Sequence, residues 1–309
     1  MTLWAHSAEA TQDLAARREN VRYLPGITLP PNVRIAQEPS YLAEPHRLFI
    51  LAVPSAHVRQ TLQRLAGDLY PPAPLLSAVK GIEGETNLRV TQVAEQELPG
   101  RALAVLSGPN LAREIAAGKP AGSVVASTDA QFAAELAALL GSDRFRVYTN
   151  TDVVGVELCG ALKNVVALAA GMVDGLRLGD SAKAGIITRG LAEMTRLGVA
   201  AGANPLTFSG LAGVGDLIAT CMSPLSRNRR AGELVGAGTP WATVEPQLAG
   251  IAEGVTTVRG ALALAALHGV ELPIAEQVDA VIHRDSSPLD AVAALMGREP
   301  KDELAGLPA

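Results

Sequence analysis

The sequence predicts an α/β domain with a doubly wound parallel sheet over residues 1–150 and an all-helical domain over residues 151–309. In the first half, short apolar runs such as LFILAVPS (48–55) alternate with amphipathic stretches. Strands that are apolar on both faces and separated by helices are typical of a parallel sheet covered on both sides. From Asp152 onward helical patterns follow one another, and no convincing strand interrupts them.

The elements of the first half can be placed from their boundaries. Residues 2–4 are expected to end a short strand, and Ser7 has the residue type and position of a helix N-cap. The remaining elements are bounded by Gly, Pro and Ser. Strands are expected at 48–55, 74–79, 102–109, 122–128 and 144–150, with helices at 56–69 and 85–98.

Gly, Pro and Asn divide the second half into helices. Its longest apolar run, residues 153–173, contains Glu157, Lys163 and Asn164, so we expect a buried helix and no membrane insertion. The expected helices are 152–176, 181–202, 214–222, 227–236, 239–247, 254–268, 274–284 and 288–296.

The net charge of −5 argues against nucleic acid or an anionic membrane as the main partner. Cys159 and Cys221 lie far apart, and no Cys/His spacing in the sequence suggests a metal site. A reducing, cytoplasmic location with both thiols in the core is expected, and no signal-peptide pattern is present at the start.

Lys163 is the only charged residue between positions 158 and 173. A lysine in such a helix either extends to its edge or lies buried beside a carboxylate. Burial would lower its pKa toward the range useful for proton transfer. The neighbouring Asn164 could then donate to a substrate oxygen.

Two further segments follow predicted strands, where ligands of open parallel sheets bind. Lys80, in SAVKGIE, is either a ligand contact or an ordinary surface lysine. In LSGPN (106–110), Gly108 leaves room for a ligand, and Asn110 is expected to cap the next helix. Simple turn chemistry would explain the same residues.

The densest basic cluster is SPLSRNRRAGEL (223–234). Ser226 is a plausible N-cap, which places Arg227 and Asn228 in the first turn of a helix. Basic residues there oppose the helix dipole, and a bound anion would relieve that conflict. We therefore favour a single phosphate over a solvated basic face or nucleic-acid binding.

The glycines of GLAGVGD (210–216) have the wrong order for a dinucleotide fingerprint, so this segment is expected to be a flexible turn presenting Asp216. No G-x-G-x-x-G follows a strand anywhere in the sequence. A nucleotide-binding domain would normally carry one.

Ordered motifs over residues 1–299 resemble the bacterial type of NAD(P)-dependent sn-glycerol-3-phosphate dehydrogenase. They include RENVRYLPG (18–26), KGIE (80–83), LSGPN (106–110), VELCGALKNV (156–165), GLAGVGDLIATC (210–221), SRNRR (226–230) and AEGV (252–255). The resemblance implies a Rossmann-like domain and reduction of dihydroxyacetone phosphate by NADH or NADPH, which supplies glycerophospholipid synthesis.

The resemblance also implies residue roles. Lys163 would be the general acid and base. The substrate would contact Lys80, Gly108, Asn110, Lys163, Asp216, Ser226, Arg227 and Asn228. The cofactor, NAD or NADP, would contact His6, Tyr23, Lys80, Ala112, Arg227, Ile251 and Glu253. A homodimer is plausible for this architecture.

The sequence departs from the family pattern at Cys159 and Asn110, where the family usually has Gly and Ser or Thr. The larger departure is at the start. Family chains open with a strand, a glycine-rich turn and a helix, and that strand would lie between the strands at 2–4 and 48–55. We therefore expect that the first βα unit is missing because the start was misassigned. The alternatives are a truncated remnant without cofactor binding and a dehydrogenase of another small hydroxy acid.

Overall fold

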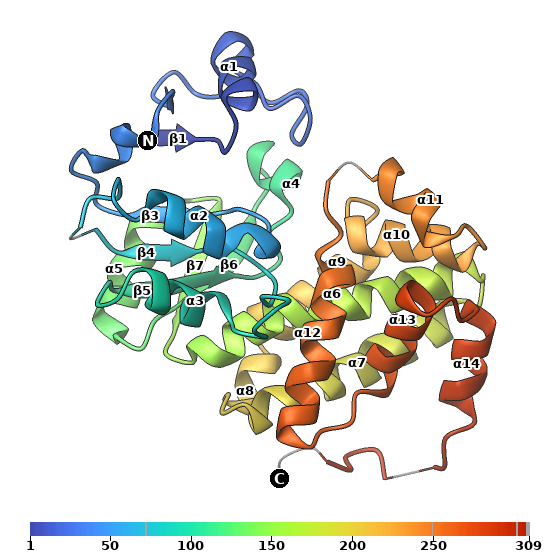
Figure 1. Ribbon diagram of the computed structural model, residues 1–309. Coiled ribbons are helices and arrows are strands. Elements are labelled where there is room, and N and C mark those ends of the chain that lie inside the picture. Colours follow the sequence, from blue (N-terminus) through green and yellow to red (C-terminus); the bar gives the residue numbers. More distant parts are fainter. Residues whose placement is uncertain (72, 249, 301, 307–309) are drawn as a thin grey trace.

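The computed structural model describes residues 1–71, 73–248, 250–300 and 302–306. The last strand, β7 (Phe145–Asn150), ends a sheet domain, and α6 (Val153–Gly175) begins a helical domain. Figure 1 shows the two domains side by side, with α6 starting beside the sheet and running through the helices. The predicted class, a Rossmann-like α/β domain followed by helices, is confirmed.

The main sheet has five strands in the order β3 (Phe49–Leu51), β4 (Leu75–Ser77), β5 (Leu103–Ser107), β6 (Ala121–Ala126) and β7. Adjacent strands in this sheet run parallel, except for β5 and β6, which run antiparallel to each other. The intervening helix α4 (Ala112–Ala116) has five residues. Such a helix is about 7.5 Å long, too short to carry the chain back along a five-residue strand of about 17 Å.

A second, two-stranded sheet pairs β1 (Thr2–Trp4) in parallel with β2 (Arg34–Ala36), a strand that the sequence analysis missed. Within the described residues it is separate from the main sheet. Helix α1 (Ala8–Arg17) begins after Ser7, whose hydroxyl oxygen accepts a hydrogen bond from the Ala10 amide at 3.2 Å. The predicted N-cap is therefore confirmed.

Helices cover both faces of the main sheet. Helices α2 (Val58–Leu65) and α3 (Val90–Glu97) bury Leu62 and Val93 on one face, while α5 (Ala130–Leu140) buries Leu136 on the other. Short 3₁₀ helices occur at η1 (Pro39–Ala43) and η2 (Ser55–His57). Because α3 begins at Val90 and not at residue 85, residues 78–89 form a long loop after β4.

The helical domain is built around α6, whose residues from Gly155 to Val173 are buried. By length and composition α6 resembles a membrane span, as does the run 205–222, but 89% of the apolar α6 window is buried by its neighbours. Both free cysteines are buried, as predicted. The other elements are α7 (Asp180–Ala200), α8 (Pro205–Phe208), η3 (Leu211–Gly215), α9 (Asp216–Met222), α10 (Arg227–Gly236), α11 (Trp241–Val244), η4 (Glu245–Gln247), α12 (Glu253–His268), α13 (Pro273–His283) and α14 (Pro288–Met296).

Helices α6 and α10 touch through their backbones. A Cβ at Gly232 would lie 2.0 Å from the Leu168 carbonyl oxygen, and one at Gly171 would lie 2.0 Å from the Arg229 carbonyl oxygen. Real Cβ atoms do not approach other atoms so closely, so only glycine permits this contact. The glycine seam therefore fixes the N-terminus of α10 relative to the middle of α6.

The expected flexible turn at 210–216 is wrong. Residues Leu211–Gly215 form a short π-helical segment that continues directly into α9. At Gly213 the chain is non-helical and passes so close to Phe208 that a Cβ would lie 2.1 Å from its carbonyl oxygen. Asp216 is thus the first residue of a helix and is 2% exposed.

Candidate active site

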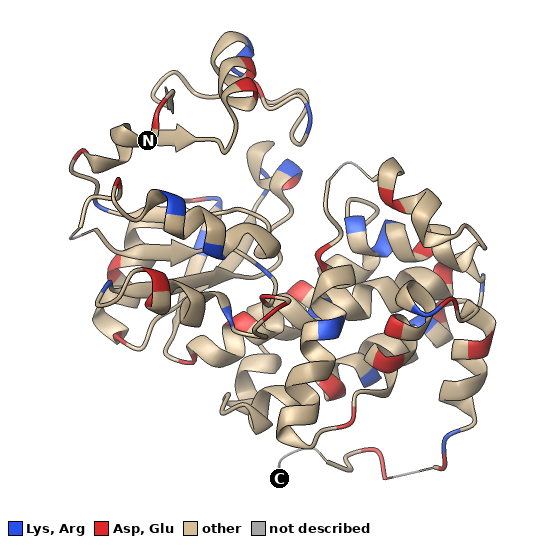
Figure 2. Cartoon of the chain, viewed as in Figure 1, with Lys and Arg blue, Asp and Glu red and all other residues tan. Residues whose placement is uncertain are grey.

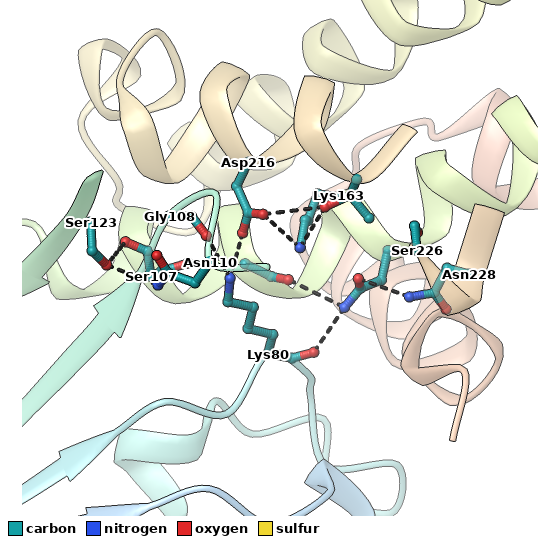
Figure 3. A network of polar contacts seen from close by, with 12 residues as sticks. Lys80, Ser107, Gly108, Asn110, Ser123, Lys163, Asp216, Ser226 and Asn228 are labelled. Atoms are coloured by element: carbon teal, nitrogen blue, oxygen red, sulfur yellow. Dashed lines mark hydrogen bonds and ion pairs between the residues drawn. The ribbon is translucent and has the colours of Figure 1, made fainter. Parts of the chain in front are cut away.

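Two lysines from different domains share one buried carboxylate (Figure 3). Lys163 Nζ donates to Asp216 Oδ1 at 2.7 Å, and Lys80 Nζ donates to Asp216 Oδ2 at 2.7 Å. Lys163 is 6% exposed. Of the two arrangements that the sequence left open for this lysine, burial beside a carboxylate is the one found.

Thr220 completes the surroundings of Lys163, and the sequence analysis missed it. Its hydroxyl oxygen accepts from Lys163 Nζ at 2.7 Å, and its hydroxyl lies 3.2 Å from Asp216 Oδ1. Asp216 and Thr220 are four residues apart in α9 and therefore lie on one helix face. The spacing of four residues between Asp216 and Thr220, in an otherwise apolar helix, is the feature of the sequence that could have identified Thr220.

Burial is the main cause that lowers the pKa of Lys163, to about 8, and the nearby charge of Lys80 lowers it further. Asp216 acts in the opposite direction but does not offset these two effects. Burial alone would raise the pKa of Asp216, yet the charges of Lys80 and Lys163 outweigh it and hold that pKa below its usual value. The cluster therefore contains an ionised carboxylate and an amine that can exchange a proton near neutral pH.

Lys80 reaches the cluster from the loop after β4. Its ammonium also donates to the Gly108 carbonyl oxygen at 2.8 Å. Its own carbonyl oxygen accepts from Asn164 Nδ2 at 3.0 Å, so α6 holds its backbone. A Cβ at Gly81 would lie 2.4 Å from Ser55 Oγ, which shows how tightly this loop is packed. Lys80 is thus a positioned side chain and not a free surface lysine.

The LSGPN segment forms one wall of the cluster. Gly108 has φ +148°, and a Cβ there would lie 2.9 Å from the Ser123 Cα. Asn110 does not cap α4, contrary to expectation, because Leu111 takes the N-cap position and Asn110 Nδ2 donates to Ser123 Oγ at 2.9 Å. Among the described residues, Ser107 Oγ and Asn110 Oδ1 are buried and lack a hydrogen-bond partner.

The N-terminus of α10 carries the residues that were expected to form an anion site. The Ser226 hydroxyl oxygen accepts from the Arg229 amide at 3.2 Å, which confirms the predicted cap, and Arg227 is exposed. The Asn228 side chain has partners that the sequence did not predict. Its Nδ2 donates to Asn164 Oδ1 at 2.9 Å, and its Oδ1 accepts from the Gly254 amide at 2.9 Å. Both of its polar atoms are thus already engaged in joining α6, α10 and α12.

Two family models match the chain. One, described as NAD-dependent glycerol-3-phosphate dehydrogenase N-terminus, covers residues 1–133, and the other, its C-terminus, covers residues 152–293. The chain belongs to the NAD-dependent glycerol-3-phosphate dehydrogenase family.

Relatives over nearly the whole chain agree with this assignment. The glycerol-3-phosphate dehydrogenase [NAD(P)+] of Streptomyces avermitilis is 46% identical over 98% of this chain and 91% of its own length. That of Geobacter sulfurreducens is 47% identical over 98% of this chain and 91% of its own. The crystal structure of the Coxiella burnetii glycerol-3-phosphate dehydrogenase, 36% identical, matches with a TM-score of 0.93 over 96% of this chain and 91% of that one.

In this glycerol-3-phosphate dehydrogenase fold, the residues expected at the cofactor come from both domains. Tyr23 and Arg227 approach the same backbone, since a Cβ at Gly250 would lie 3.2 Å from Tyr23 Cε1 and 2.6 Å from Arg227 Nη1. Ile251 beside them is 41% exposed. These side chains leave an accessible surface where the two domains meet.

The other expected cofactor contacts are less closely grouped. Glu253 accepts from the Ser55 amide at 3.1 Å and from Ser55 Oγ at 2.5 Å, so its carboxylate joins α12 to η2. Ala112 is exposed at the start of α4, and His6 is exposed after β1. The His6 carbonyl oxygen accepts from Arg64 Nη1 at 3.0 Å.

The residues present fit part of a nicotinamide dinucleotide of the kind that this family uses, since they offer polar contacts for it but no G-x-G-x-x-G phosphate loop after a strand. The unpartnered Ser107 Oγ and Asn110 Oδ1 lie next to Gly108, whose carbonyl oxygen binds Lys80. Buried polar atoms without partners are costly, and a bound ligand is one way to satisfy them. Tyr23 and Arg227 provide an aromatic face and a cation farther along the same inter-domain surface.

Proposed function

We propose that this protein interconverts dihydroxyacetone phosphate and sn-glycerol 3-phosphate with NAD(H) or NADP(H). The observation that carries the proposal is the buried Lys163–Asp216–Lys80 cluster. It combines a proton donor of lowered pKa with a second ammonium directed at the same point. Reduction of a ketone needs both, because negative charge develops on the carbonyl oxygen.

Lys163 is the proposed general acid. Its ammonium gives a proton to the substrate oxygen during reduction and takes it back from the hydroxyl during oxidation. When bound, the nicotinamide supplies or accepts the hydride. Asp216 and Thr220 keep the Lys163 amine oriented, and Lys80 adds positive charge beside the developing oxyanion.

The phosphate is proposed to bind at the start of α10. The Ser226 hydroxyl proton, the Arg227 guanidinium and the free amides of the first turn all favour an anion there. Asn228 lies in the same turn, and its remaining Nδ2 hydrogen is a further proposed contact with the substrate. Binding of the remote phosphate then orients the carbonyl at Lys163.

The proposed cofactor contacts are Lys80 near the nicotinamide and, along the dinucleotide, His6, Tyr23, Ala112, Arg227, Ile251 and Glu253. Gly108 and Asn110 are proposed to contact the substrate. We further propose a cytoplasmic enzyme that supplies glycerophospholipid synthesis, with a homodimer as the assembly. Figure 2 shows acidic and basic residues interspersed in both domains, which supports a small-molecule substrate over a nucleic acid.

The test is NADH oxidation with dihydroxyacetone phosphate, on residues 1–309 and on the protein translated from any upstream in-frame codons. Arg227→Ala should raise KM for dihydroxyacetone phosphate about tenfold or more, through loss of a charge-assisted contact. Arg230→Ala is the matched control, because Arg230 is 54% exposed, faces Glu233 and lies beyond the first turn. Equal KM values for the two variants would count against the phosphate site.

Two results would contradict the proposed function. A small hydroxy acid without phosphate that turns over better than glycerol 3-phosphate would point to another dehydrogenase of the same architecture. Failure of both proteins to quench the fluorescence of NADH would favour a non-catalytic remnant.

A further inference from the structure

One stripe of α6 holds the loop that carries Lys80. Glu157, Gly160 and Asn164 are spaced three and four residues apart, so they lie on the same helix face. Asn164 binds the carbonyl oxygen of Lys80 at 3.0 Å. A Cβ at Gly160 would lie 3.4 Å from Lys80 Cγ, so the lysine stem packs directly on this stripe.

Glu157 holds the other end of the same loop. Its Oε1 accepts from the Thr91 amide at 2.8 Å, and its Oε2 accepts from Thr91 Oγ1 at 2.6 Å and from Arg89 Nη1 at 2.5 Å. The Glu157 side chain is 5% exposed, and it lies at the N-terminus of α3, where a negative charge is favoured. A carboxylate from the helical domain thus caps a helix of the sheet domain.

The loop between these two attachments has little regular structure of its own. It runs from the end of β4 to Val90 and contains Lys80 near its beginning. Without these attachments, the position of the Lys80 ammonium would depend on its bonds to Asp216 and Gly108 and on the ion pair between Arg59 in α2 and Glu83 in the loop. The attachments come from the same rigid helix that carries Lys163.

We propose that Glu157 is a positioning residue, which holds the 78–91 segment on α6 so that Lys80 meets Asp216 beside Lys163. It does not touch the reacting atoms and acts only through Lys80. The role of Lys80 in catalysis rests on the proposed function, whereas its placement by Glu157 does not.

The direct readout is the pKa of Lys163. The ionisable groups that act on its ammonium are Lys80 from the loop and Asp216 and Cys221 from α9. Displacing Lys80 removes a like charge and leaves Asp216 in place, so the pKa of Lys163 must rise toward its usual value. The sequence contains few lysines (Lys80, Lys119, Lys163, Lys183 and Lys301), so NMR of ¹³Cε-labelled lysine can follow each of them.

The experiment compares Glu157→Gln with Glu193→Gln. Glu193 is an equivalent buried carboxylate, which accepts from the Ile274 amide at 2.7 Å at the start of α13 but does not contact the loop. We expect the pKa of Lys163 to rise in Glu157→Gln and to stay near 8 in Glu193→Gln. A folded Glu157→Gln protein with an unchanged Lys163 pKa would overturn the proposal, whether or not the enzyme is active.

A double-mutant cycle separates positioning from general stability. Glu157→Gln should lower kcat about tenfold to a hundredfold, because a displacement of about 1 Å at a catalytic group is sufficient for such a loss. In a Lys80→Met background the same change should lower kcat no further. Equal losses in both backgrounds would contradict the proposal.

Thr91→Val is the reserve variant if Glu157→Gln does not fold. It removes the hydrogen bond from Thr91 Oγ1 to Glu157 and the one that Arg89 Nη1 donates to Thr91 Oγ1 at 3.1 Å, and it keeps both partners of the Arg89–Glu157 ion pair. The pKa of Lys163 should then rise by a smaller amount. No change in that pKa would again overturn the proposal.

Discussion

At the scale of single residues, the site depends on one carboxylate that serves two ammonium groups. Asp216 is 3% exposed in its side chain and bonds Lys80 and Lys163 at 2.7 Å each. With both lysines protonated, the cluster carries one net positive charge in a buried setting. Such a cluster stabilises a developing oxyanion and makes release of one proton easier.

Replacing Lys163 with Met should lower kcat for dihydroxyacetone phosphate reduction about a hundredfold to ten-thousandfold, because the proton donor is lost. The KM for NADH should change little, since Lys163 is not among the proposed cofactor contacts. Steady-state kinetics in both directions provide the measurement. A variant that keeps more than a tenth of the wild-type kcat would exclude Lys163 as the acid.

The pH dependence follows from the state of Lys163. Reduction requires the protonated amine, so its rate should fall as pH rises through about 8, whereas oxidation should gain over the same range. Lys80→Met should move both transitions to higher pH, since the like charge that lowers the pKa of Lys163 is gone. Rate profiles against pH for the wild type and the variant test this, and a transition that stays in place would contradict it.

At the scale of elements, the α6–α10 contact sets the distance between the proton donor and the phosphate site. Gly232→Ala should destabilise the protein by about 1–3 kcal/mol, because its Cβ would overlap the Leu168 carbonyl oxygen. Gly185→Ala is the control, because a Cβ at Gly185 in α7 meets nothing within 4 Å and should stabilise by about 0.5–1 kcal/mol. Thermal unfolding of the two variants measures the difference. Equal Tm values would show that the α6–α10 contact does not require glycine at position 232.

Local signals in the sequence were sufficient for several elements. Ser7 and Ser226 were predicted as caps because capping involves residues only three positions apart. Lys163 was predicted to be important because a lone charge in an apolar helix is unusual. In each case the residues on which the prediction was based lie within one or two helical turns in the sequence.

The elements that the sequence did not reveal depend on distant partners. Strand β2 has three residues, lies between Pro31 and Pro39, and is paired with β1. Glu157 looked like a mere interruption of an apolar run, because its partners Arg89 and Thr91 lie in another domain. Asn228 was expected to contact the substrate, and nothing local in the sequence indicates its bonds to Asn164 and Gly254.

At the scale of the whole molecule, buried carboxylates join distant helices, and one of them predicts a pH dependence of stability. Burial is the main cause that raises the pKa of Glu193 to about 7, against hydrogen bonds from Ile274 and Ala275 that lower it. The folded protein therefore holds this proton more tightly than the unfolded chain. The stabilisation from protonated Glu193 is fully present below the pKa that this group has in the unfolded chain. It is lost as the pH rises through about 7.

Glu193→Gln should remove that dependence. The difference in free energy of unfolding between variant and wild type should shift in favour of the variant between about pH 4.5 and pH 7, by no more than about 3 kcal/mol. Lys163, whose pKa is lowered to about 8, acts in a separate window above that value. Denaturant unfolding at several pH values gives the measurement, and a difference that does not vary with pH would show that Glu193 is not protonated.

The glycine seam has a consequence for substrate choice. Because α10 already rests on the α6 backbone, it has no room to move toward α6. The distance between the proposed phosphate site on α10 and the Lys163 amine is therefore fixed, and it selects substrates by their length. Phosphorylated ketones one carbon longer than a triose should bind and yet be reduced slowly, since their carbonyl would come to rest past the ammonium.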